Sequence, residues 1–290
     1  MRIAIASGKG GTGKTTVAVG LARSWRDRSR AVHLLDCDVE EPNCHLLLKP
    51  RITGSIPVTV PIPTVLSEKC DRCGRCVKLC AFGALTLSKD GVTVFPELCH
   101  ACGGCAVICP QDAITEEPRE IGHVKVGHAG GIQFTGGWLR VGEPQSVPVI
   151  DAVKARATTV DATPDNVTLL DVPPGTSCPV VASVQDTDLV VLIAEPTPFG
   201  LHDLTLITTT MRDLNRSVGI VINRVGIGDD RVREFAQQLG IPVLAEIPDS
   251  RTLARAQARG QPAGAAVPEV AAAFEKLTRT LEQQVSACAS

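Results

Sequence analysis

The sequence has no marked excess of either charge. Its 290 residues include 29 Lys and Arg against 31 Asp and Glu, which gives a formal net charge of −2. A chain with this balance has no general attraction for nucleic acids or anionic membranes. We therefore expect no nucleic-acid partner.

Long apolar runs and an export signal are also missing. No stretch is long and apolar enough to span a bilayer, and Met1–Ser7 lacks the basic flank, apolar core and cleavage site of a signal peptide. We expect a cytoplasmic protein without stable membrane insertion. Twelve cysteines would not persist as disulfides in a reducing compartment, so their regular spacing favours metal ligation.

A glycine-rich loop of the form G-K-G-G-T-G-K-T lies between a predicted strand, Arg2–Ser7, and a predicted helix, Thr15–Asp27. Glycines let backbone N–H groups point at phosphate oxygens, and the helix N-terminus adds positive potential. Lys14 would reach the β and γ phosphates, and the Thr15 hydroxyl would bind Mg²⁺. The residues predicted to bind the phosphates of ATP are Gly8, Gly10, Gly11, Thr12, Gly13, Lys14, Thr15 and Thr16.

Alternating strands and helices predict an α/β fold, a mostly parallel sheet with helices on both faces. Ala31–Leu35 is a predicted strand that ends in Asp36 and Asp38, at the edge where such sheets bind ligands. Further strands are predicted at Val167–Leu170, Leu189–Ala194, Ser217–Ile222 and Ile241–Ile247, and helices at Leu201–Leu214, Arg231–Leu239, Arg251–Arg259 and Pro268–Val285. The last helix has an apolar stripe and mixed charges, so we expect it to pack in the core.

Two segments are interpreted as connections. Pro50–Pro63 contains four prolines and is predicted to be a linker or an irregular edge. Ile121–Gln145 is rich in glycine and is predicted to be a return linker with tight turns. A mobile hinge or a partner surface is the alternative for that segment.

The cysteines between these connections form two runs of the spacing C-x2-C-x2-C-x3-C, 29 residues apart. This is the spacing of two-cluster bacterial ferredoxins, in which the fourth cysteine of each run ligates the other cluster. Zinc would leave the third and fourth cysteines of each run unexplained. The predicted ligands are Cys70, Cys73, Cys76 and Cys109 for the first [4Fe-4S] cluster and Cys99, Cys102, Cys105 and Cys80 for the second.

The repeat predicts a small inserted α+β domain of the bacterial ferredoxin type at residues 61–119. Residues 1–60 and 120–290 would form the discontinuous nucleotide-binding domain. Of the four cysteines outside the runs, Cys37 and Cys44 are interpreted as small apolar residues, as is Cys288. Cys178 is interpreted as a plain thiol, with a bridging role at a dimer interface as the alternative.

The extra lysine of the loop, Lys9, makes the sequence resemble the deviant Walker A ATPases, the family of MinD, Mrp, ParA and the nitrogenase iron protein. The resemblance implies a nucleotide-stabilised homodimer in which Lys9 reaches the phosphates bound by the partner. Asp38 would position the attacking water. Asp36 and Asp171 would hold hydrated Mg²⁺, and Gly175 would sense the γ phosphate. The base would lie near Asn223, Arg224, Pro248 and Asp249.

With its cysteine block, the whole chain resembles MinD-superfamily ATPases that contain an inserted ferredoxin domain. The first hypothesis is a slow, partner-stimulated ATPase in which Lys9, Lys14 and Asp38 act in hydrolysis and ATP gates electron transfer to a partner protein. The second is an iron-sulfur carrier or assembly ATPase of the Mrp type. The third is a MinD-like positioning or regulatory switch that senses redox state.

Overall fold

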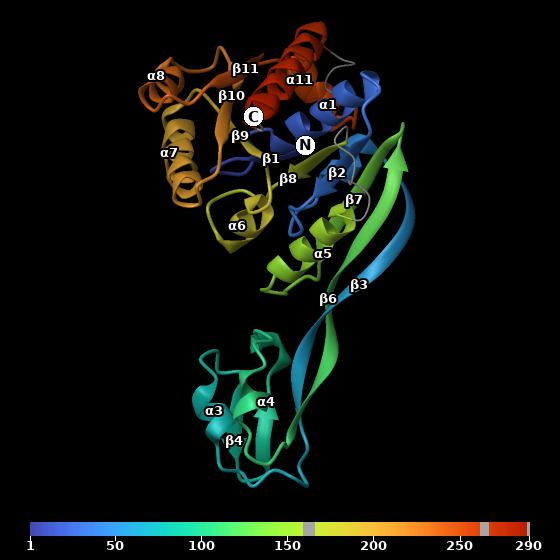
Figure 1. Ribbon diagram of the computed structural model, residues 1–290, viewed down its shortest axis with the longest axis vertical. Coiled ribbons are helices and arrows are strands. Elements are labelled where there is room, and N and C mark those ends of the chain that lie inside the picture. Colours follow the sequence, from blue (N-terminus) through green and yellow to red (C-terminus); the bar gives the residue numbers. More distant parts are fainter. Residues whose placement is uncertain (159–165, 262–266, 289–290) are drawn as a thin grey trace.

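The computed structural model describes residues 1–158, 166–261 and 267–288. Its centre is a nine-stranded sheet in the order β11-β10-β9-β1-β8-β2-β7-β6-β3. Neighbours from β11 to β7 run parallel, whereas β6 and β3 are antiparallel at one edge. Helices cover both faces (Figure 1). The predicted α/β fold with a mostly parallel sheet is confirmed.

The strands of this sheet are β1 Arg2–Ala6, β2 Val32–Asp36, β3 Arg51–Val65, β6 Ile114–Ala129, β7 Ile132–Leu139, β8 Val167–Asp171, β9 Leu189–Ala194, β10 Val218–Val225 and β11 Val243–Pro248. The helices packed around it are α1 Lys14–Asp27, α2 Cys44–Leu48, α5 Val147–Thr158, α6 Cys178–Val184, α7 Pro198–Asp213, α8 Arg231–Gln238, α9 Arg251–Ala258 and α11 Pro268–Cys288. No helix among the described residues is long and apolar enough to cross a membrane.

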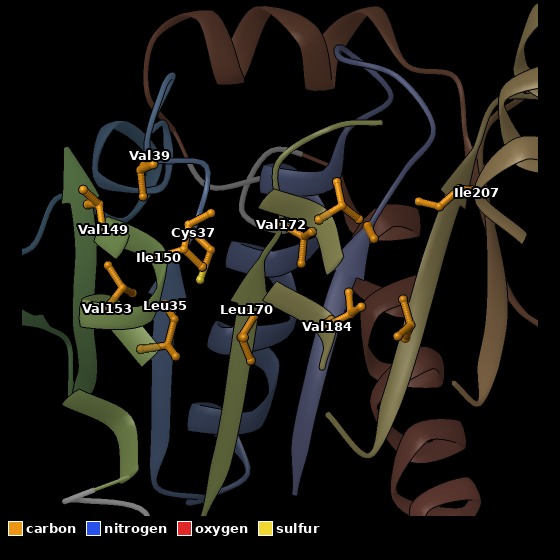
Figure 2. Close-up of a cluster of buried hydrophobic side chains, with 14 of the residues drawn as sticks. Leu35, Cys37, Val39, Val149, Ile150, Val153, Leu170, Val172, Val184 and Ile207 are labelled. Carbon is orange, nitrogen blue, oxygen red and sulfur yellow. The ribbon is translucent and has the colours of Figure 1, made fainter. Parts of the chain in front are cut away.

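Central strands are apolar on both faces because helices cover each of them. In β1, Ile3 and Ile5 pack toward α1 and α11, whereas Ala4 and Ala6 join the core of the opposite face. Figure 2 shows part of that second core, where side chains of β2 and β8 meet α5 and α6. Both layers therefore hold the carboxyl ends of the central strands in place.

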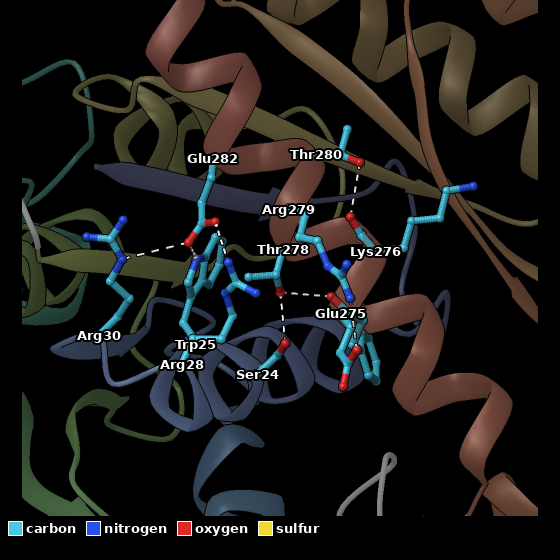
Figure 3. Close-up of polar contacts among 11 residues, drawn as sticks. Ser24, Trp25, Arg28, Arg30, Glu275, Lys276, Thr278, Arg279, Thr280 and Glu282 are labelled. Atoms are coloured by element: carbon cyan, nitrogen blue, oxygen red, sulfur yellow. Dashed lines mark hydrogen bonds and ion pairs between the residues drawn. The ribbon is translucent and has the colours of Figure 1, made fainter.

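Helix α11 packs against α1 through an apolar stripe and a polar rim. Its side chains Val270, Phe274, Leu277 and Leu281 are buried, as predicted, while the side chain of Val285 lies outside the described residues. At the rim, Glu282 accepts a hydrogen bond from Trp25 at 3.2 Å and pairs with Arg28 at 3.0 Å (Figure 3). The helix is a core element of the fold.

Gly20 marks the closest approach of these two helices. A Cβ at this position would lie 2.5 Å from the buried ring of Phe274. We expect Gly20→Ala to lower the free energy of unfolding by about 1–3 kcal/mol through overpacking, although alanine is the better helix former by about 1 kcal/mol. Urea denaturation followed by circular dichroism measures the change. The loss is expected to shrink in a Phe274→Leu background, and a stabilised single variant would contradict the packing argument.

The predicted linker at Pro50–Pro63 is wrong, but its placement at an edge is confirmed. Strand β3 runs through it as the last strand of the sheet and pairs with β6 from Arg51 to Val65. Proline is tolerated there because an edge strand has one side without a partner. Pro61 and Pro63 are two residues apart, so their missing N–H groups fall on the same side of the strand.

The predicted return linker at Ile121–Gln145 is also wrong over most of its length. It contains the second half of β6 and all of β7, which form an antiparallel hairpin turning at Gly130 and Gly131. Beyond this hairpin, the first half of β6 pairs only with β3. The two strands thus form a ribbon that carries the cysteine-rich unit away from the sheet (Figure 1).

The cysteine-rich unit has a duplicated backbone. Helix α3, Arg75–Leu79, and helix α4, Gly104–Ile108, start and end 29 residues apart. Positive φ angles recur with the same offset at Arg72 and Ala101, at Gly74 and Gly103, and at Gly83 and Asp112. A short hairpin of β4 Leu85–Ser88 and β5 Gly91–Val94 and a 3-10 turn, Pro96–Leu98, complete the unit. The duplication therefore extends from the cysteines to the main chain.

Candidate nucleotide and metal sites

The glycine-rich loop joins the carboxyl end of β1 to the first turn of α1, the strand, loop and helix arrangement predicted for a phosphate site. Gly11 and Gly13 have positive φ angles of 78° and 99°, which favour glycine. The Ser7 hydroxyl donates to the carbonyl of Lys9 at 2.6 Å and fixes the start of the loop. The Gly175 amide donates to the Ser7 carbonyl at 3.0 Å, so the second predicted switch lies beside the loop.

Two predicted metal-site carboxylates meet at the adjacent ends of β2 and β8, where Asp36 is directly opposite Asp171. Both are buried, and one oxygen of each has no hydrogen-bond partner. Thr15 donates to Asp171 at 2.6 Å. Burial, reinforced by Asp171, raises the pKa of Asp36 well above its ordinary value, and burial also raises the pKa of Asp171. These carboxylates and the Thr15 hydroxyl are donors that suit hydrated Mg²⁺.

Sequence reasoning missed the thiol that completes this group. Cys44 donates its S–H to Asp171 at 3.3 Å, and its N–H donates to Asp36 at 2.9 Å. Its burial matches the small apolar role predicted for it, and burial raises its pKa well above the ordinary thiol value. Cys44 is therefore a neutral donor that helps to fix the two carboxylates.

The two residues predicted to act on the γ phosphate, Lys14 and Asp38, lie near these carboxylates. Burial lowers the pKa of Lys14, while Asp171 and Asp38 oppose that shift. Burial and then Asp171 raise the pKa of Asp38 to about 7, while Lys14 opposes the shift. A buried lysine and an aspartate at this place are suited to phosphate binding and to the positioning of water.

Lys9 and Arg224 share one carboxylate, that of Glu195. Glu195, which directly follows β9, approaches Lys9 at 3.2 Å and Arg224 at 2.6 Å. Arg224 also donates to the carbonyl of Gly11 at 3.4 Å and has a φ of 58°, which is uncommon for a residue with a side chain. Glu195 was not predicted, because nothing in the local pattern of the chain marks an ion pair with residue 9.

Three of the remaining predicted nucleotide residues have contacts within the protein. Asn223 donates to the carbonyl of Thr12 at 2.7 Å and faces the phosphate loop. The Thr16 hydroxyl accepts a hydrogen bond from the Gln257 amide of α9. Strand β11 ends at Pro248. The N–H of the next residue, Asp249, donates to the carbonyl of Val225 at 3.0 Å and fixes the turn after the strand.

The eight cysteines of the repeat line two separate hollows. Cys80 lines a cavity of about 230 Å³ together with the first three cysteines of the second run. Cys109 lines a hollow of about 10 Å³ together with the first three cysteines of the first run. Cys76 borders both. The fold thus brings each fourth cysteine to the opposite run, the crossed arrangement predicted from the spacing.

The donor set fits an iron-sulfur cubane better than a single zinc ion. Zinc with Zn–S bonds of about 2.3 Å needs sulfurs about 3.8 Å apart. In the described part of the chain, Asp36, Cys44 and Asp171 form the one group of three possible metal donors within 4.8 Å of one another, and no cysteine trio of the repeat meets that spacing. The larger cavity has an apolar lining and a stacked pair of rings, Phe82 and His100. The smaller hollow is bordered by Cys70, Cys73, Cys76 and Cys109.

Of the cysteines outside the repeat, Cys37 is buried as predicted, whereas Cys178 is exposed at the start of α6. The side chain of Cys288 lies outside the described residues. Exposure in a single chain suits both the plain thiol and the bridging role at a dimer interface, so the prediction for Cys178 stays a prediction.

A glycine loop that joins a parallel strand to a helix, with buried carboxylates at the ends of two neighbouring strands, defines a P-loop nucleotide-binding protein. Comparison with known families gives the same result. Residues 3–263 match the CobQ/CobB/MinD/ParA nucleotide binding domain. The chain belongs to this family.

Three known proteins show how far the similarity extends. The uncharacterized protein MJ0578 of Methanocaldococcus jannaschii is 34% identical over 231 residues, which cover 79% of this chain and 80% of that protein. An iron-sulfur cluster carrier protein of Aquifex aeolicus is 25% identical over 300 residues, 98% of this chain and 67% of that protein. The septum site-determining protein MinD of Pyrococcus horikoshii, solved with Mg-ADP, has a TM-score of 0.61 at 19% identity, covers 99% of this chain and 98% of its own, and shares the fold.

Proposed function

We propose that this protein hydrolyses ATP as a nucleotide-stabilised homodimer and couples ATP to electron transfer through two [4Fe-4S] clusters. The nucleotide-binding part would comprise residues 1–60 and 120–290, and the ferredoxin-like insert residues 61–119. The ribbon of β3 and β6 passes through both boundaries without interruption, so the insert is attached by paired strands rather than by two free linkers.

Each group of residues in the nucleotide site has its own role in hydrolysis. Loop N–H groups and the N-terminus of α1 bind the phosphates, and Lys14 neutralises charge that develops on them. Asp38 accepts a hydrogen bond from the attacking water, and Lys9 of each chain reaches the nucleotide of the other. Mg²⁺, when bound, supplies further charge neutralisation, with Thr15 and water-mediated Asp36 and Asp171 as its protein partners.

The cysteine sets supply eight thiolates, four for each cluster. Cys99 and Cys109 each have a backbone N–H directed at the sulfur at 3.4 Å, from Ala101 and Ala113. Such N–H groups stabilise a ligating thiolate and tune the potential of a bound cluster. When bound, each cluster supplies a one-electron redox centre.

The observation that carries the proposal is a continuous set of contacts from Asp38 to the insert. Val39, the neighbour of Asp38, accepts a hydrogen bond from the N–H of Leu139 at 2.9 Å. The next residue, Arg140, donates its N–H to Ile121 of the ribbon at 2.8 Å. These bonds tie the first switch to residues 139–146, which we call the coupling segment.

The coupling segment also holds the insert. Glu143, whose side chain is 3% exposed, forms a bidentate ion pair with Arg119 of the ribbon at 2.6 and 3.2 Å. Gln145 donates to the main-chain carbonyl of the proposed cluster ligand Cys99 at 2.6 Å. A shift of Asp38 on nucleotide binding therefore has a short route to the second cluster, which supports coupling between two distinct sites.

The test is electron transfer from the dithionite-reduced protein, purified without oxygen, to a redox dye, with and without MgATP. We expect the transfer rate or the midpoint potential of a cluster to change with MgATP and not with MgADP. The absence of any difference in a protein that binds ATP and about eight irons per chain would exclude gating.

A second function, cluster delivery, is favoured by two observations. Cys73 and Cys102 are exposed, so each hollow is open to solvent at one ligand. The relative from Aquifex aeolicus is named an iron-sulfur cluster carrier protein. ATP-dependent transfer of a cluster to an apo-ferredoxin, with loss of iron from this protein, would favour delivery over gated electron transfer.

A further inference from the structure

Glu195 lies in a position that no part of the proposed hydrolysis uses. Its side chain is 8% exposed, and its two oxygens contact two different cations, Lys9 at 3.2 Å and Arg224 at 2.6 Å. A buried carboxylate is stable only when it is paired. The residue therefore needs at least one of these cations in every state of the protein.

The two cations are not equally free to leave. Arg224 has two contacts, with the carboxylate of Glu195 at 2.6 Å and with the carbonyl of Gly11 at 3.4 Å. Among the described residues, Lys9 pairs with Glu195 alone. The Lys9 side chain is 35% exposed and that of Arg224 48%, so the number of contacts and not exposure distinguishes the two cations. Because Arg224 remains as its partner, the buried carboxylate of Glu195 is still paired after Lys9 leaves.

Lys9 cannot contact Glu195 of its own chain and the phosphates of a second chain at the same time, because its single ammonium would have to occupy two places. We propose that Glu195 is a positioning residue that holds Lys9 in the nucleotide-free chain and must release it before the ATP-bound dimer closes. This inference rests on the homodimer of the proposed function. In thermodynamic terms, the ion pair stabilises the open state alone and so weakens dimerisation.

The size of the effect follows from the exposure of the pair. An ion pair with one partly exposed member contributes about 0–1 kcal/mol, so each release would weaken dimerisation about threefold. Two chains release two lysines when the dimer closes. We therefore expect Glu195→Gln to tighten ATP-dependent dimerisation about tenfold, because the amide still accepts from Arg224 but no longer attracts Lys9.

The experiment is sedimentation equilibrium of the holoprotein in MgATP, with an Asp38→Ala substitution in every chain to prevent hydrolysis. The matched control is Glu246→Gln, which removes an ion pair of similar geometry with Arg233 at 2.6 and 2.9 Å on the surface. The control is expected to dimerise like the parent. In a Lys9→Gln background, Glu195→Gln is expected to have no effect on dimerisation.

A second measurement does not depend on dimerisation. In the nucleotide-free protein, acylation of Lys9 by an N-hydroxysuccinimide ester, followed by mass spectrometry, is expected to be faster in Glu195→Gln than in the parent. Equal or weaker dimerisation of Glu195→Gln, with unchanged Lys9 acylation and a normal circular dichroism spectrum, would overturn the role of Glu195. If the parent stays monomeric in MgATP while it binds ATP, the homodimer itself fails, and this inference fails with it.

Discussion

Replacement of Lys14 by alanine is expected to lower the ATPase rate about 100-fold or more. Lys14 is the buried lysine of the proposed phosphate site, where burial lowers its pKa and Asp171 and Asp38 oppose that shift. Without it, the loop N–H groups must stabilise the phosphates next to uncompensated carboxylates. The rate is measured by phosphate release at saturating ATP, and the affinity by titration with a fluorescent ATP analogue.

The matched control for this variant is Lys276→Ala, which removes an ammonium from the solvent-facing side of α11. Its ATPase rate is expected to equal that of the parent. A Lys14→Ala protein that hydrolyses ATP within a few-fold of the parent would contradict the assignment of the phosphate site.

Replacement of Cys80 by serine is expected to remove the second cluster and to lower the iron content from about eight to about four per chain. The reason is spatial, because Cys80 lies in the first run but lines the cavity of the second. Three cysteines are a poor substitute for four around a cubane. Iron analysis and electron paramagnetic resonance of the reduced protein measure the loss.

Two further variants show which cluster is lost. Cys102→Ser removes an exposed cysteine proposed as a ligand of the second cluster, and Cys73→Ser removes the corresponding cysteine of the first set. The spectrum of Cys80→Ser is expected to match that of Cys102→Ser. A match to Cys73→Ser instead would mean that the fourth cysteines are not crossed. Retained ATP binding would show that the nucleotide-binding part is still folded.

Local chemistry at fixed spacing is what could be predicted from the sequence. A phosphate loop needs glycines, a lysine and a threonine within a few residues. A ferredoxin-type run needs its four cysteines within about eleven residues. The ends of the central strands could also be located from the sequence. A buried parallel strand is a continuous apolar run, and the polar residues that follow it mark its end.

Pairing between distant segments could not be predicted in this way. The prolines of β3 and the glycines of β7 indicate loops by composition, yet both strands are ordered by β6, which lies between them in sequence. Cys44 contacts Asp171, and Glu195 contacts Lys9, across more than 100 residues each. Such contacts depend on the whole sheet and leave no local pattern.

The most direct test of the account is hydrogen–deuterium exchange of the holoprotein with and without MgATP. If the nucleotide site and the insert are coupled, MgATP is expected to change exchange in the coupling segment and at the loop that begins with Cys99, as well as at the phosphate loop. Gln145→Ala, which removes the hydrogen bond to Cys99, is expected to keep the change at the phosphate loop and to lose it at Cys99. Changes confined to the phosphate loop and the switch residues in the parent protein would contradict the coupling of ATP to the clusters.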